Sequence, residues 1–152
     1  MKVTNETHTA AIKTLQEYFK SGKQYPFVLL FGSFASGEAA PSSDVDLGIY
    51  VGKEPDFLEM GRHISTLESL LQRRVDLTLL DDLEARNPLL AFEILNQHIP
   101  LLIRDNERYI AFKTRAQLAY LDARPLIEAN REALQKRIEA NRIGERNFAT
   151  TY

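Results

Sequence analysis

The chain has 152 residues, 44% of them hydrophobic and 26% charged, which is the composition of an ordinary globular protein forming one domain. With 19 basic and 21 acidic residues the net charge is −2, so there is no overall electrostatic case for nucleic-acid binding, and a polymerase-like role on a long DNA template is disfavoured. The absence of cysteine excludes disulfides and thiolate metal sites and fits a reducing compartment. No signal core or membrane-length apolar run is present, so we expect a cytoplasmic protein with no membrane contact.

Hydrophobic periodicity and turn residues divide the chain into alternating helices and strands. In chain order the prediction is a helix over 7–20, a strand over 27–31, a short helix from 32, a strand over 44–51, a helix over 56–71, a strand over 75–80, a helix over 88–95, a strand over 98–104 and a helix from 106 onward. We therefore expect an α/β (α+β) domain with a small mixed sheet flanked by helices and a helical C-terminal extension. The predicted division is a core over residues 1–104 and an extension of the same domain over residues 105–152.

Local signals refine several of these elements. Pro100 favours an edge or strand-start position, and Pro125 is expected to break or kink the last helix. Asp81 and Asp82 are expected to cap the helix that follows them. In the helix over 56–71 the residues expected to face inward are Phe57, Met60, Ile64, Leu67, Leu70 and Leu71.

The first candidate site residues lie between residues 27 and 51. Gly32-Ser33 directly follows a buried strand and opens a helix, where free backbone N–H groups can bind an anion. Asp44 and Asp46 share one face of the next strand, and two carboxylates so placed repel each other unless a cation lies between them. A phosphate-binding turn beside two hard oxygen ligands is typical of sites that handle a nucleoside triphosphate with magnesium.

This combination resembles the nucleotidyltransferase superfamily that includes DNA polymerase β and kanamycin nucleotidyltransferase. The phrase GSFASGEAAPSSDVDL is similar to the minimal nucleotidyltransferases (MNT), antitoxins often encoded beside a HEPN ribonuclease toxin. The resemblance covers residues 27–80 and implies a polymerase β-like fold with a third aspartate, Asp76, on a strand next to the first two. One departure is Ser36, where many relatives carry an arginine that contacts phosphate.

The resemblance also implies an activity and a partner. Asp44, Asp46 and Asp76 would hold two Mg²⁺ ions and act as the catalytic carboxylates, while Gly32 and Ser33 would bind the phosphates of ATP. The implied reaction is transfer of AMP to a tyrosine of a HEPN ribonuclease toxin, in a hetero-oligomer with that toxin. Two alternatives stay open: an antitoxin that acts by occlusion alone with a vestigial nucleotide site, and a nucleotidyltransferase whose acceptor is a small molecule such as an aminoglycoside.

The histidines and the C-terminal arginines are expected to have structural roles. The histidines lack metal-ligand spacing and are expected to be surface or packing residues; they are His8, His63 and His98. The arginines of the C-terminal region are expected to form a solvated, charge-balanced helix face rather than a triphosphate clamp; they are Arg104, Arg108, Arg115 and Arg124. The tail, residues 144–152, is expected to be frayed in isolation, and one hypothesis is that Phe148 and Tyr152 anchor it in a groove of a partner.

Overall fold

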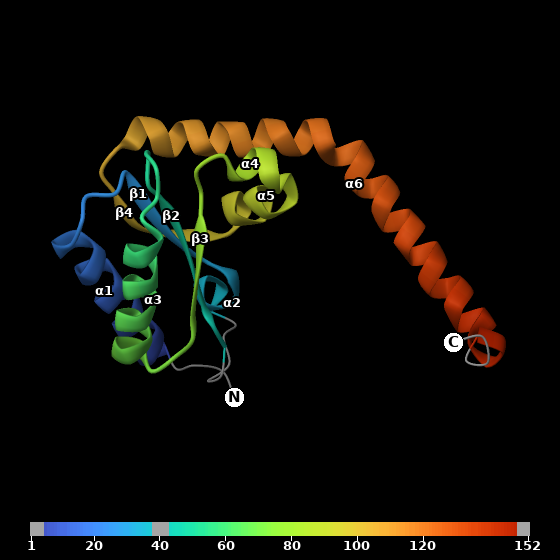
Figure 1. Cartoon of the computed structure of the whole chain (residues 1–152), viewed down its shortest axis with the longest axis horizontal. Helices are drawn as coiled ribbons and strands as arrows, with labels where there is room; N and C mark the ends of the chain where they lie inside the picture. Colours follow the sequence, from blue (N-terminus) through green and yellow to red (C-terminus); the bar gives the residue numbers. More distant parts are fainter. Residues whose placement is uncertain (1–4, 38–42, 149–152) are drawn as a thin grey trace.

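The fold is that of a computed structural model, which describes residues 5–37 and 43–148 (Figure 1). The elements are α1 (Asn5–Ser21), β1 (Phe27–Phe31), α2 (Gly32–Ser36), β2 (Val45–Tyr50), α3 (Phe57–Leu71), β3 (Val75–Leu79), α4 (Leu83–Arg86), α5 (Pro88–Asn96), β4 (His98–Ile103) and α6 (Asn106–Phe148). All the predicted helices and strands are present, and α4 is an additional short helix that the sequence pattern does not predict. The predicted α+β class with a small mixed sheet is confirmed.

The four strands form a sheet in the order β3-β2-β1-β4. The central strand β1 runs antiparallel to β2 and to β4, whereas β2 and β3 run parallel and are connected through α3. Strand β4 lies at the edge, where Pro100 is exposed beside an irregularity in the pairing with β1. The predicted edge position of this proline is confirmed, because proline cannot donate a hydrogen bond to a neighbouring strand.

Helices α1 and α3 cover one face of the sheet. The buried side chains on this face belong to α1, α3 and alternate strand positions; they include Leu15, Phe19, Val28, Leu30, Val45, Leu47, Ile49, Met60 and Leu67. Two residues of α3 depart from the prediction, since Phe57 is 72% exposed and Leu70 is 55% exposed. The buried stripe of α3 follows Met60 and Leu67; Leu70 falls off that line, and Phe57 occupies the first position of the helix.

Helices α4, α5 and the first half of α6 cover the opposite face. Their buried side chains pack on Phe27 and Leu29 of β1; they are Leu83, Ala91, Ile94, Tyr109, Phe112 and Ala116. The rings of Phe92 on α5 and Tyr120 on α6 stack with centroids 3.8 Å apart, which fixes these two helices to each other.

The expected capping by Asp81 and Asp82 is wrong. The Asp81 carboxylate instead accepts hydrogen bonds from the backbone N–H groups of Val51 (2.8 Å) and Gly52 (2.7 Å), and so joins the ends of β3 and β2. Asp82 stands at the N-cap position of α4 but makes no side-chain cap bond. Helix α5 is capped by Asn87, whose side chain accepts from the Leu90 N–H at 3.1 Å, with proline at the first helical position.

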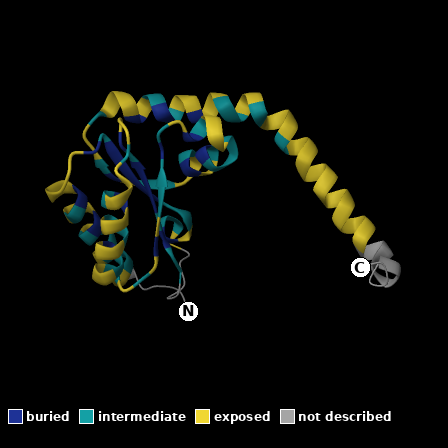
Figure 2. Cartoon of the chain, in the orientation of Figure 1, coloured by how far each residue is buried: buried dark blue, intermediate teal, exposed yellow. Residues whose placement is uncertain are grey.

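Helix α6 is one helix of 43 residues with Pro125 inside it. Figure 1 shows the helix bending about midway and then leading away from the sheet. Proline removes one helical hydrogen bond and its ring crowds the preceding turn, so Pro125 kinks this helix rather than ending it. Residues 128–141, beyond the bend, are all exposed (Figure 2). Most of the turn-rich segment 39–43, the side chain of Phe148 and all of Tyr152 lie outside the described residues.

Among the residues that the structure describes, no helix combines the length and the apolar character of a membrane span.

Candidate active site

The corner between β1 and α2 is built on Gly32. This residue has φ +75°, a left-handed conformation that glycine adopts without steric cost, and it opens the five-residue helix α2. The N-cap residue Phe31 makes no side-chain cap bond, so the first turn of α2 depends on other groups to satisfy its N–H donors. The C-cap residue of α2 is Gly37, whose N–H donates to the carbonyl of Ser33.

The backbone of Gly32 lies against the carboxylate of Asp46. A β-carbon at position 32 would lie 3.1 Å from Cγ of Asp46 and would overlap its Oδ2. The pairing of β1 with β2 causes this contact, because it sets Phe31 opposite Asp46. The Gly-Ser corner and the first acidic strand therefore form one site, and only glycine leaves room for the carboxylate at this position.

Asp46 and Asp76 are directly paired across the parallel strands β2 and β3. Paired residues of neighbouring strands point to the same face of a sheet, so both carboxylates lie on the face that carries α4, α5 and α6. Asp76 is exposed and Asp46 is half-buried. Asp44 immediately precedes β2, which begins one residue later than predicted. The structure thus brings together Asp46, Asp76 and Gly32, with Asp44 two residues from Asp46.

The electrostatics of the site is governed by neighbouring carboxylates. Burial raises the pKa of the Asp46 carboxyl above its ordinary value, and the nearby charges of Asp76 and Asp44 raise this pKa further. Since both neighbouring acids disfavour the charge on Asp46, a bound cation would stabilise the ionised carboxylate.

The chemistry of the donor set fits a hard divalent cation such as Mg²⁺, which prefers carboxylate oxygens. In the described part of the chain, however, no three or more His, Cys, Asp or Glu side chains gather closely enough to hold a metal ion. Asp46 and Asp76 are the paired donors, and Asp44 stands outside the regular strand that would fix its side-chain direction.

A cavity of about 500 Å³ opens beside the Gly-Ser corner. One wall comes from the end of β1 and from α2, and the other from α5; the lining residues are Phe31, Gly32, Ser33, Ser36, Leu90, Glu93, Asn96 and Gln97. Helix α5 reaches this place because β4, which follows it, pairs its first residue with the last residue of β1. The volume is within the range of sites for small-molecule ligands.

Neither the α5 wall nor the role of Arg73 follows from the sequence pattern. The Arg73 guanidinium donates to the carbonyl of Ser43 at 3.0 Å and lies 5.1 Å from the ring centre of Phe34. It thereby holds the backbone just before Asp44 against α2. The signal available in the sequence was only the position of an arginine at the start of the third strand, which does not reveal a contact 30 residues away.

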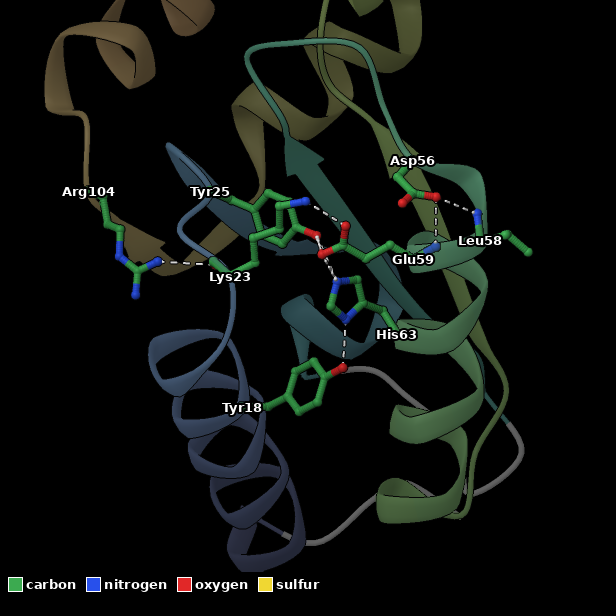
Figure 3. A network of polar contacts seen from close by, with 8 residues as sticks. All are labelled: Tyr18, Lys23, Tyr25, Asp56, Leu58, Glu59, His63 and Arg104. Carbon is green, nitrogen blue, oxygen red and sulfur yellow. Dashed lines mark hydrogen bonds and ion pairs between the residues drawn. The ribbon is translucent and has the colours of Figure 1, made fainter.

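The histidines are hydrogen-bonded packing residues. His8 contacts the carbonyl of Phe34, and His98 bridges the carbonyl of Ile94 and the hydroxyl of Tyr109. His63 joins α3 to α1 and to the segment before β1 (Figure 3).

In that network Nδ1 of His63 lies 2.6 Å from the Tyr18 hydroxyl and Nε2 lies 2.7 Å from the Tyr25 hydroxyl. Tyr25 donates to Glu59 at 3.1 Å, and Lys23 binds the same carboxylate at 2.7 Å. Burial lowers the pKa of His63 and raises the pKa of Tyr25, so these groups act as neutral hydrogen-bonding partners.

The four C-terminal arginines have partners within the chain. Arg104 donates to the carbonyls of Lys20 and Lys23. The others form ion pairs, namely Arg108 with Asp105, Arg115 with Glu84 and Arg124 with Glu128. These contacts agree with the expectation of a charge-balanced helix rather than a triphosphate clamp.

The family model described as polymerase beta, nucleotidyltransferase matches residues 13–107, which include the whole sheet and the three aspartates. The chain belongs to this family. A comparison with the sequences of curated proteins gives no match.

Solved structures of toxin–antitoxin proteins share the nucleotidyltransferase fold of this chain. One is a chain in the crystal structure of a toxin–antitoxin with AMP-PNP, with TM-score 0.61 and 20% identity over 90% of this chain and 99% of the other. A second, from Shewanella oneidensis, is a chain in a structure of a tri-AMPylated HEPN toxin in complex with an MNT antitoxin, with TM-score 0.60 and 16% identity over 87% and 98%. A third belongs to the toxin–antitoxin MntA-HepT, with TM-score 0.55 and 18% identity over 90% and 99%. At these identities the likeness is one of fold.

Proposed function

We propose that this nucleotidyltransferase transfers AMP from ATP to a tyrosine hydroxyl of a cognate HEPN ribonuclease toxin and so acts as its antitoxin. The observation that carries the proposal is the in-register pairing of Asp46 with Asp76 beside the Gly32 corner, in a chain of the nucleotidyltransferase family. The AMP-PNP described for one structural neighbour and the AMPylated HEPN toxin described for another support the co-substrate and the acceptor. The proposal includes a hetero-oligomer with the toxin, and because the co-substrate is ATP, a cytoplasmic location.

Within this proposal Asp44, Asp46 and Asp76 would hold two Mg²⁺ ions. When bound, Mg²⁺ would neutralise charge on the triphosphate and lower the pKa of the attacking hydroxyl. The N–H groups of Gly32 and Ser33, together with the Ser33 hydroxyl, would hold the departing phosphates.

The proposed transfer is an in-line displacement. The tyrosyl oxygen forms a bond to the α-phosphorus, the bond from that phosphorus to the bridging oxygen of the β-phosphate breaks, and pyrophosphate leaves. The tyrosyl proton passes to Asp76, whose exposed position on β3 suits a base that must meet a group on another protein.

We also propose that residues 1–104 form the catalytic core and that residues 105–152 are a helical extension of the same domain. The support is that Tyr109, Phe112 and Ala116 of α6 belong to the same buried cluster as Phe27 and Leu29 of β1.

The test is to mix the purified chain with ATP, MgCl₂ and the HEPN toxin encoded beside it, and to measure the intact masses of both proteins. We expect the toxin to gain one or more AMP groups, with peptide fragmentation locating them on tyrosine. The Asp46→Asn variant should give no gain while still binding the toxin, and Asp122→Asn, an exposed acid on α6, is the matched control that should remain active.

Two outcomes would contradict the proposal. If the toxin gains no mass but its ribonuclease activity is still inhibited, equally by the parent chain and by Asp46→Asn, the chain acts by occlusion. If AMP appears on an added aminoglycoside and not on the toxin, the acceptor is a small molecule.

A further inference from the structure

The two walls of the cavity beside Gly32 differ in chemistry. The α2 wall offers backbone N–H groups and the hydroxyl of Ser33, whereas the Ser36 hydroxyl donates to the carbonyl of Ser33 at 2.9 Å. The α5 wall offers one apolar side chain, Leu90, followed by a carboxylate, Glu93, and the two side-chain amides of Asn96 and Gln97. A carboxylate repels phosphate, so the α5 wall suits a different part of a nucleotide.

The α5 residues form one continuous surface. Leu90, Glu93 and Asn96 are spaced three residues apart, so they follow one side of the helix, and Gln97 is the C-cap residue directly after it. The opposite side of α5 is held in the core by Ala91 and Ile94, which are fully buried. The polar wall is therefore carried by an anchored helix rather than by a loop.

The polar groups of this wall are available for a ligand. Among the residues that the structure describes, the side chains of Glu93, Asn96 and Gln97 have no hydrogen-bond or ion-pair partner, and all three are exposed. A side-chain amide offers one donor group and one acceptor, which matches an amino group beside a ring nitrogen, as adenine presents them. A carboxylate only accepts, so Glu93 beside the 6-position of a purine favours the 6-amino group of adenine over the O6 acceptor that guanine presents there.

We propose that Glu93 and Asn96 determine base specificity, reading the amino group and a neighbouring ring nitrogen of adenine while Leu90 packs against the ring. The inference rests on the proposed function, because it takes the Gly-Ser corner as the phosphate end of the same nucleotide. It adds to that function a recognition surface on α5 and a preference for ATP over GTP.

The experiment measures equilibrium binding by calorimetry, in MgCl₂, of the α,β-methylene analogues of ATP, GTP and CTP. These analogues cannot be cleaved at the reacting bond, so the readout is affinity and not turnover. We expect the parent chain to bind the adenine analogue about 10-fold or more tightly than the guanine analogue, as one good side-chain–base pair allows. Glu93→Gln should reduce this ratio several-fold, chiefly by improving guanine binding, and Asn96→Ala should weaken adenine binding.

The matched control is Glu107→Gln, which removes an exposed carboxylate on α6 and should leave the ratio unchanged. Circular dichroism and thermal unfolding show whether each variant is folded. If the parent chain binds no analogue, the proposed nucleotide site itself is wrong. If it binds all analogues equally, prefers the cytosine analogue, or keeps its ratio in both α5 variants, the α5 inference is wrong while the proposed function stands.

Discussion

Gly32 and Asp46 are in contact across the ends of β1 and β2, and the contact leaves no space for a β-carbon on residue 32. We predict that Gly32→Ala abolishes Mg²⁺-dependent nucleotide binding, because the added methyl must displace either the carboxylate or the corner. The φ of +75° adds a backbone cost of about 1–2 kcal/mol for any residue with a side chain. Titration calorimetry with the ATP analogue measures the loss.

The Gly37→Ala variant distinguishes the steric effect of Gly32→Ala from its backbone strain. Gly37 has φ +76°, almost the same as Gly32, but a β-carbon there would meet no atom of the described residues within 4 Å. We expect Gly37→Ala to lose about 1–2 kcal/mol of stability through backbone strain alone and to keep its nucleotide affinity. Equal loss of binding in both variants would mean that the Gly32–Asp46 contact has no specific role.

The three aspartates should destabilise the protein when no divalent cation is bound. Burial and the charges of Asp76 and Asp44 disfavour the ionised form of Asp46, so Asp46→Asn removes an unfavourable charge. We predict that this variant unfolds a few degrees above the parent chain in a metal chelator. Added MgCl₂ should raise the unfolding temperature of the parent chain but not of the variant.

Asp76→Asn should shift the unfolding temperature in the same direction, because it removes the larger of the two like-charge contributions at Asp46. Asp122→Asn on the exposed surface of α6 is expected to change it little. A lower unfolding temperature for Asp46→Asn in chelator would show that the acids are already neutralised by other contacts.

The sequence was sufficient to predict the elements of the site but not all of their neighbours. Alternation correctly placed Asp46 on the face opposite Leu47, and likewise Asp76 opposite Leu77. That β3 lies next to β2 could not follow from periodicity, because a strand pattern carries no information about its partner. The family resemblance supplied that step, and the register confirms the pairing.

The α5 wall could not be predicted for a related reason. Gln97 reaches Gly32 through the pairing of β4 with β1, and an antiparallel pair between strands so far apart in the chain leaves no local signal. The capping prediction failed because the Asp81 carboxylate is engaged elsewhere. Its two oxygens accept hydrogen bonds from the N–H groups of Val51 and Gly52 at the end of β2.

Gly48, two residues after Asp46 on β2, is closely packed against a core side chain. A β-carbon at this position would lie 2.8 Å from Cδ2 of Leu80, which is fully buried. We predict that Gly48→Ala costs about 1–3 kcal/mol by overpacking. The double variant with Leu80→Val should recover part of this loss, because the shorter side chain removes the clashing methyl. Chemical denaturation of the parent, both single variants and the double variant gives the coupling energy, and strict additivity would contradict the packing argument.

The distal half of α6 should be dispensable for the stability of the core. Residues 128–141 are all exposed, whereas Phe112 in the first half is fully buried. Removal of residues 129–152 is expected to change the free energy of unfolding of the remaining domain by about 0.5 kcal/mol or less. Phe112→Ala, in contrast, should cost about 3–5 kcal/mol. Unfolding of the shortened chain at a much lower denaturant concentration would mean that the distal half folds back on the core.

The His63 network should make stability depend on pH. Burial, with a smaller contribution from Lys23, holds the pKa of His63 below its ordinary value of 6.5, against the opposite effect of Glu59. The unfolded chain therefore binds more protons at this residue than the folded chain in the window below pH 6.5. Stability contributed by the neutral ring is present above that pH and is lost as the pH falls through the window.

The His63→Gln variant tests the direction of this pH dependence of stability. At about pH 8 the variant should be less stable by about 1–3 kcal/mol, because the hydrogen bonds with Tyr18 and Tyr25 are lost or weakened. Toward about pH 5 the difference in free energy of unfolding between the variant and the parent chain should shrink. Only the parent chain is destabilised by protonation of a buried imidazole. Urea denaturation at several pH values measures the difference directly and cancels the contribution of the carboxylates common to both proteins. A difference that stays constant or grows on acidification would show that His63 is charged in the folded protein and paired with Glu59, which lies 3.7 Å from its ring.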